Sequence, residues 1–335
     1  MSLTLLLFLV LAMRIFPPSV LIVDDKLSRL LLASISGFLL LAAAKVSIYF
    51  YLYGWPRYSD PYSEPSHLAL YLLPLIIYRL TGRLTDVWSW LAVALAMLFA
   101  PSTTLVIGLV LLLIVIVIQG GLSFKKAITI FFSVSLAYVL SQFDLFDTSH
   151  YTDRIRGVMQ SGSPIYINTS SLIWLNGWSQ AQESLVGTFG LGTGFNQMGC
   201  GRFAFSGIFS WQMLVGNGLL LNTENGSFTA AKIIAELGIA GVIIVFFLTI
   251  LSVRSILKVR TVKIYDVSDT QGDLRNIVSR ARATAGVCIL IFLYIRNPGY
   301  FQLPLITALS LLFIRATDVI KMGHRSQSFN QMKEC

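Results

Sequence analysis

The chain has 335 residues, of which 55% are hydrophobic and only 12% are charged, and its formal net charge is +9. Soluble domains carry about twice that charged fraction, roughly 25%, and a water-soluble fold could not cover this much apolar surface. The composition therefore excludes a soluble globular domain and predicts that the lipid bilayer surrounds most of the chain.

Apolar runs recur along the whole chain and lack the residue-by-residue alternation of barrel strands. We predict an all-α polytopic integral membrane protein with about nine transmembrane helices and one large periplasmic loop carrying short helices. The first run contains Arg14 followed by Pro17 and Pro18, so it could instead be a broken or re-entrant helix. The predicted spans lie at about 2–23, 30–53, 66–80, 86–101, 103–119, 127–142, 229–253, 283–296 and 301–315.

Lysine and arginine mark one set of links as cytoplasmic, because short cytoplasmic links are enriched in both. Topology alone accounts for most of the positive charge, and no nucleic acid partner is needed to explain it. This orientation places the N-terminus outside and the C-terminus inside. The chain then divides into N-terminal transmembrane helices (1–142), a large periplasmic loop (143–228), C-terminal transmembrane helices (229–315) with a cytoplasmic link (254–282), and a cytoplasmic tail (316–335).

Several kinds of chemistry have no support in the sequence. It contains no phosphate-binding Walker loop, no HExxH zinc motif and no GxSxG nucleophile motif. The cysteines Cys200, Cys288 and Cys335 offer no pair on one side of the membrane, so neither a disulfide nor a metal site is expected. We expect no cofactor.

Ionisable residues at membrane depth are costly and are therefore candidates for a functional site. By the predicted topology they converge on the outer side: Arg57, Glu64, His67, Arg154, Arg156, Lys232, Glu236 and Arg296. Structural roles remain open for some of them. Lys232 and Glu236, four residues apart on one helix face, could simply neutralise each other. Arg296 could extend to the lipid headgroups, and Glu64 could cap the third span.

Four strings in order resemble a known family. They are Glu64-Pro65-Ser66-His67-Leu68-Ala69-Leu70; Trp178 with Gly192-Thr193-Gly194-Phe195-Asn196; Asn225-Gly226-Ser227-Phe228 with Glu236-Leu237-Gly238 and Gly241; and Arg296-Asn297-Pro298-Gly299-Tyr300-Phe301. Together they resemble the bacterial O-antigen polymerases (Wzy type), which form one superfamily with the O-antigen ligases and the protein O-oligosaccharyltransferases. The resemblance covers about residues 55–315.

The resemblance implies a glycosyltransferase of the bacterial inner membrane whose active site faces the periplasm. The outer segments contain no cluster of metal ligands with suitable spacing, so we expect a metal-independent reaction. Its substrates would be oligosaccharide repeat units on undecaprenyl pyrophosphate. Membrane lipids would surround the protein and contact it. A flippase and a chain-length regulator are implied as partners. Arginine suits the diphosphate because its planar guanidinium can bind two phosphate oxygens at once. A glutamate or histidine would act as the general base that takes the proton of the acceptor hydroxyl.

The expected site follows from these roles. The expected catalytic residues are Glu64, His67, Arg154, Arg156 and Arg296. The expected substrate-binding residues are Arg57, Arg202, Asn196, Asn225, Lys232, Glu236 and Trp178. The outer-segment aromatics offer sugar-stacking surfaces, namely Tyr151, Tyr166, Trp174, Trp178 and Trp211.

Two alternatives stay open at this point. The ligases carry a histidine before the span with the Glu-x-Gly pattern, whereas this chain reads Asn222-Thr223-Glu224-Asn225-Gly226 there. The missing histidine favours a polymerase over a ligase that transfers glycan to the lipid A core. A transporter of lipid-linked oligosaccharides would need similar charges, but transporters commonly show internal repeats and none is evident in this sequence.

Overall fold

The structure, a computed structural model, consists of helices wherever the chain is described. It describes residues 27–37, 40, 65–82, 86–99, 102–118, 169–198, 228–258, 270–296 and 302–314. All elements within these ranges are helical, which agrees with the predicted all-α class. The chain forms two compact units: the first comprises Met1–Val134, Leu251–Ile289 and Phe301–Cys335, and the second Ser135–Ile250 and Leu290–Tyr300.

Two helices in the described part are long and apolar enough to cross a membrane. They are α11 (Thr229–Lys258) and the segment Arg275–Tyr294 of α12 (Thr270–Tyr294). The remaining apolar helices there are shorter. The predicted spans 2–23 and 127–142 lie outside the described residues.

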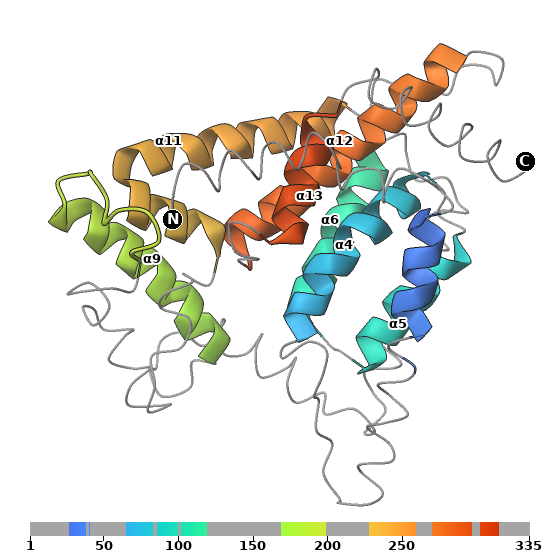
Figure 1. Cartoon of the computed structure of the whole chain (residues 1–335), viewed down its shortest axis with the longest axis horizontal. Helices are drawn as coiled ribbons and strands as arrows, with labels where there is room; N and C mark the ends of the chain where they lie inside the picture. Colours follow the sequence, from blue (N-terminus) through green and yellow to red (C-terminus); the bar gives the residue numbers. More distant parts are fainter. Residues whose placement is uncertain are drawn as a thin grey trace, which may run out of the picture. The chain divides into compact units, whose positions relative to one another are not determined.

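The core of the first unit is built around α4 (Pro65–Gly82). This helix packs against α5 (Val87–Phe99), α6 (Thr103–Ile118) and α13 (Leu303–Leu312). Figure 1 shows α4 and α6 side by side. Leu72 and Leu73, then Ile76 and Ile77, are all fully buried, so α4 is covered on several sides, as expected for a helix that is apolar all round.

Small residues let helices of this unit approach closely. A Cβ atom on Gly108 of α6 would overlap the side chain of Leu73 on α4. A Cβ atom on Gly286 of α12 would lie 2.6 Å from the carbonyl oxygen of Ser252 on α11. Such contacts are typical of helix interfaces in membranes, where close packing takes over from the hydrophobic effect as the driving force.

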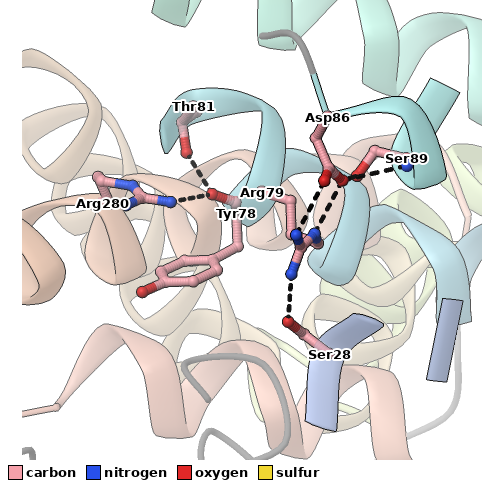
Figure 2. Close-up of polar contacts among 7 residues, drawn as sticks. All are labelled: Ser28, Tyr78, Arg79, Thr81, Asp86, Ser89 and Arg280. Atoms are coloured by element: carbon pink, nitrogen blue, oxygen red, sulfur yellow. Dashed lines mark hydrogen bonds and ion pairs between the residues drawn. The ribbon is translucent and has the colours of Figure 1, made fainter. Parts of the chain in front are cut away.

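A buried ion pair joins three helices of the first unit (Figure 2). Arg79 in the last turn of α4 contacts both carboxylate oxygens of Asp86, at 2.8 and 2.9 Å, and donates to Ser28 Oγ at 2.7 Å. Asp86 is also the N-cap of α5, because its Oδ2 accepts the backbone N–H of Ser89 at 3.1 Å. Arg79 therefore gives the buried Asp86 carboxylate both a counter-ion and two hydrogen bonds.

Two further arginines, both on α12, bind carbonyl oxygens at helix ends. Arg280 donates to Tyr78 O at 2.8 Å and lies over the Tyr78 ring, 4.6 Å from its centroid. Arg282 donates to Ile314 O, just after α13, at 2.8 Å. Carbonyls near the C-terminal end of a helix carry partial negative charge, which favours arginine as a partner there.

The helix boundaries differ from the sequence prediction at two places. α12 begins at Thr270, whereas the span was expected at 283–296 and the residues before it in a cytoplasmic link. α11 continues to Lys258 beyond the predicted end at 253. The polar first turns of α12 are helical because they pack against the rest of the first unit. Val278 and Ala281 are buried there, and Arg280 and Arg282 have carbonyl partners.

Removal of one partner from the buried Arg79–Asp86 pair should destabilise the protein. Arg79→Met leaves the Asp86 charge buried without its counter-ion, which costs about 3–5 kcal/mol and should lower the thermal unfolding midpoint in detergent by several degrees. Adding Asp86→Ser should restore most of the loss, because serine still caps α5. The control Arg275→Met, at an exposed position of α12, should have little effect; an equal loss there would refute this role for Arg79.

Candidate functional site

The second unit contains a break in its longest helix. Within α11, Gly238 has φ 61° and ψ −133°, a conformation essentially restricted to glycine. The break separates a short piece, 229–237, from a long piece, 239–258, and the two pieces run in different directions (Figure 1). A broken helix exposes carbonyl groups on one side of the break and amide groups on the other, and both need partners.

The loop that follows α9 (Thr169–Gly187) supplies partners for both sides of the break. Its amides bond to the carbonyls that end the short piece, and one of its carbonyls accepts the first amide of the long piece. The three hydrogen bonds are Thr193 N to Ala235 O (2.9 Å), Gly194 N to Glu236 O (3.0 Å) and Ile239 N to Gly190 O (2.8 Å). The loop therefore stabilises the break and is itself fixed by it.

Glycines make this contact possible because the backbone of the loop lies directly against the backbone of α11, which leaves no room for a side chain. Gly192 has φ 82°, and a Cβ atom there would overlap the Glu236 carbonyl and the Gly238 nitrogen. A Cβ atom on Gly238 would overlap the carbonyl of Gly190. Gly190, Gly192 and Gly238 therefore serve the docking of the loop onto α11.

A buried ion pair lies immediately before the break. Lys232 Nζ is 3.6 Å from Glu236 Oε1, and the two residues are only 5% and 1% exposed. Lys232 Nζ also donates to Asn196 Oδ1 at 3.3 Å, and Met198 N donates to Glu236 Oε1 at 3.4 Å. Asn196 is exposed and has φ 57°, so it joins the buried cluster to the surface.

An aromatic cluster lies at the start of the same short helix piece. Phe228 is fully buried, with ring centroids 5.7 Å from Trp174 and 4.8 Å from Trp178. The partly exposed Trp174 donates its indole N–H to Tyr294 O at 2.8 Å. This bond fixes the end of α12 in the second unit, two residues before Arg296.

A buried glutamine on α9 has no polar partner within the part of the chain that the structure describes. Gln180 is 2% exposed, and neither its Nε2 nor its Oε1 forms a hydrogen bond. It lies between Asn176 and Ser184 at four-residue spacing, hence on one helix face, and Ser184 Oγ donates to Ala235 O. That face therefore looks toward the short piece of α11. An unsatisfied buried amide costs about 1–3 kcal/mol, and a bound hydroxyl group would satisfy it.

The structure brings together four of the residues that the sequence suggested as binding substrate. Trp178, Asn196, Lys232 and Glu236 all line the contact between α9, its following loop and the short piece of α11. Arg296 belongs to the same unit. The sequence reasoning missed Gln180, although the polar stripe at 176, 180 and 184 was visible as a helical pattern.

Of the other predicted site residues, His67 alone lies within the described ranges. His67 belongs to the first turn of α4, in the first unit. The predictions for the remaining residues lie outside the described ranges, namely those for Arg57, Glu64, Arg154, Arg156, Arg202 and Asn225. Within the described ranges no three His, Cys, Asp or Glu side chains are grouped as a metal site would require.

No protein-family model matches this chain, and neither a curated protein nor a solved structure matches it.

The backbone contact at the break predicts different effects for two glycines of one loop. Gly192 and Gly194 both have positive φ, but a Cβ atom on Gly194 would meet only Gln197 Cγ, at 3.6 Å. Gly192→Ala should therefore lower the thermal unfolding midpoint much more than Gly194→Ala, because it adds a backbone clash to a similar conformational strain. Equal shifts for the two variants would show that conformational strain alone matters and that the docking contact does not.

Proposed function

We propose that this protein is a glycosyltransferase of the bacterial inner membrane that polymerises oligosaccharide repeat units carried on undecaprenyl pyrophosphate. About nine helices cross the membrane in this proposal, and the active site faces the periplasm. The two long apolar helices support a membrane location. The resemblance to the O-antigen polymerases supplies the reaction and the substrate class.

The main structural support is the polar cluster before the break in α11. It combines a cation, a carboxylate and an amide, from Lys232, Glu236 and Asn196, with aromatic rings and the unpartnered Gln180. Lysine binds phosphate as a point charge, whereas aromatic rings and amides suit sugar faces and hydroxyls. A lipid-linked sugar diphosphate presents both kinds of group.

The proposed reaction transfers the growing glycan to a hydroxyl group of another repeat unit. The hydroxyl oxygen attacks the anomeric carbon, the bond from that carbon to the phosphate oxygen breaks, and lipid pyrophosphate leaves. The hydroxyl proton passes to a base, for which Glu64 and His67 remain the candidates. Lys232 and Arg296, with Arg154 and Arg156, stabilise the charge on the departing diphosphate. Glu236 balances Lys232 while the site is empty.

The broken helix also favours one alternative from another class. Discontinuous helices commonly form the substrate sites of secondary transporters, near the middle of the bilayer. A transporter of lipid-linked oligosaccharides would use the same cluster to bind its cargo without cleaving it. The two functions differ in whether the glycan becomes longer.

Elongation by the purified protein tests the proposal and the role of Lys232. Given lipid-linked repeat units, the protein should make longer lipid-linked chains without ATP or divalent metal, because the cleaved sugar–phosphate bond drives the reaction. Lys232→Met should reduce the rate about 10²- to 10³-fold, the usual effect of losing one preorganised charge-stabilising group.

The matched control is Lys258→Met, an exposed lysine at the other end of α11, which should keep full activity. Transport of lipid-linked sugars across a vesicle membrane without any elongation would instead identify a transporter. Unchanged elongation by Lys232→Met would remove the cluster from the active site.

Gln180→Leu separates a ligand-binding role from a structural one. Leucine has a similar size and needs no hydrogen bond, so the variant should be as stable as the parent or more stable, by about 1 kcal/mol. Elongation should nevertheless fall, mainly through a higher KM for the lipid-linked substrate. A lower unfolding midpoint with unchanged KM would show that Gln180 only supports the fold.

A further inference from the structure

The turn that follows α9 exposes large apolar side chains. Phe189 is 94% exposed and Leu191 is 82% exposed, and Val186 in the last turn of α9 is also exposed. Residues 186–195 read Val-Gly-Thr-Phe-Gly-Leu-Gly-Thr-Gly-Phe and contain no charged side chain. A loop in contact with water would not be expected to gather apolar residues in this way.

Phe189 occupies a backbone position that usually belongs to glycine. Its φ is 53°, in the left-handed region, which is unfavourable for a bulky residue. The hydrogen bonds Phe189 N to Val186 O (3.3 Å) and Gly190 N to Leu185 O (2.8 Å) form the Schellman pattern that ends α9. Glycine would end the helix with less strain, so the exposed phenyl ring needs another explanation.

The backbone amides of this turn are all satisfied within the protein. Each of the seven N–H groups from Thr188 to Gly194 donates a hydrogen bond to a protein oxygen. Five of these bonds stay within α9 and the turn, and Thr193 and Gly194 donate to α11. Most surface loops leave such groups to water. Non-helical backbone near membrane depth is tolerated only when its polar groups have protein partners, a requirement that these seven amides meet.

The exposed turn is continuous with the apolar surface of α11. Gly190 contacts the first residue of the long helix piece, Ile239, which is itself exposed, as is Ile243 one turn later. The long piece measures about 30 Å at 1.5 Å per residue, close to the hydrocarbon thickness of a bilayer, and its basic residues Arg254 and Lys258 lie in the turns at its far end, where such side chains extend to the headgroups. The turn therefore lies at the level where that helix would enter the hydrocarbon.

We propose that the turn Thr188–Gly194 is a membrane anchor. Its backbone lies at the boundary between lipid headgroups and hydrocarbon, and Phe189 and Leu191 insert among the acyl chains. The partner is the lipid bilayer, and the anchor holds the break in α11 at a fixed depth. This inference does not depend on the proposed glycosyltransferase activity.

Spin labels at single cysteines test the depth of the turn in the full-length protein. Cys200, Cys288 and Cys335 are first replaced, and one cysteine is introduced at Phe189 or Leu191. The protein is placed in nanodiscs of phosphatidylethanolamine and phosphatidylglycerol. Power saturation then compares collisions with oxygen, which concentrates in lipid, against collisions with a water-soluble nickel chelate. Ile243 serves as the lipid reference and Gln182, exposed on α9, as the control.

The measured quantity is the ratio of the collision rate with oxygen to the collision rate with the chelate. This ratio should be at least several times larger for labels at 189 and 191 than for the label at 182. Preferential access of the chelate at 189 and 191 would place the turn in water and overturn the proposal. Protection from both reagents would show a protein partner instead and would also overturn it. Access of the chelate to a label at Ile243 would show that the long piece of α11 is not in lipid. This result would also overturn the proposal that the turn is a membrane anchor.

Discussion

The second unit depends on the break at Gly238, where hydrogen-bonding groups of α11 lose their helical partners and find new ones in a single loop. Such a break in an apolar helix is costly unless every freed group is satisfied. Here the Ala235 and Glu236 carbonyls and the Ile239 amide are bonded to the loop after α9. The loop can come this close because neither Gly192 nor Gly238 has a side chain.

The position of the polar cluster follows from this break. Lys232 and Glu236 occupy the last turns before it, and Asn196 belongs to the loop that caps it. A continuous helix would leave the ion pair as an isolated charge pair inside a membrane bundle. The break instead connects the pair to an exposed loop residue, Asn196.

The first unit uses charge differently. Arg79, Arg280 and Arg282 are committed to the carboxylate of Asp86 and to carbonyls at helix ends. From the sequence alone, lysines and arginines served only to mark the cytoplasmic links. In the structure these three arginines form hydrogen bonds and an ion pair that link neighbouring helices. The charges of the second unit instead form a cluster that includes the exposed Asn196.

The sequence predicted the helical class and the apolar runs of α4 and α11, and it offered the pairing of Lys232 with Glu236 as one alternative, because these depend on composition and local spacing. It did not predict the break at Gly238, since the partner loop lies more than 40 residues earlier. It also placed the start of α12 too late, because Arg280 and Arg282 read as link residues until their carbonyl partners are known. Asn196 and Lys232 meet only through the docking of the loop. Gln180 was missed because an unpartnered amide can be recognised only once its surroundings are known.

The most direct test of the account is hydrogen exchange, resolved to single amides, in the intact protein in lipid. The account predicts that the amides of Thr193, Gly194 and Ile239 exchange as slowly as those within the neighbouring turns of α11, because each is bonded across the break. Exchange of these three amides at the rate of an unprotected loop would contradict it. In that case the loop would not hold the break, and the polar cluster would have no fixed geometry.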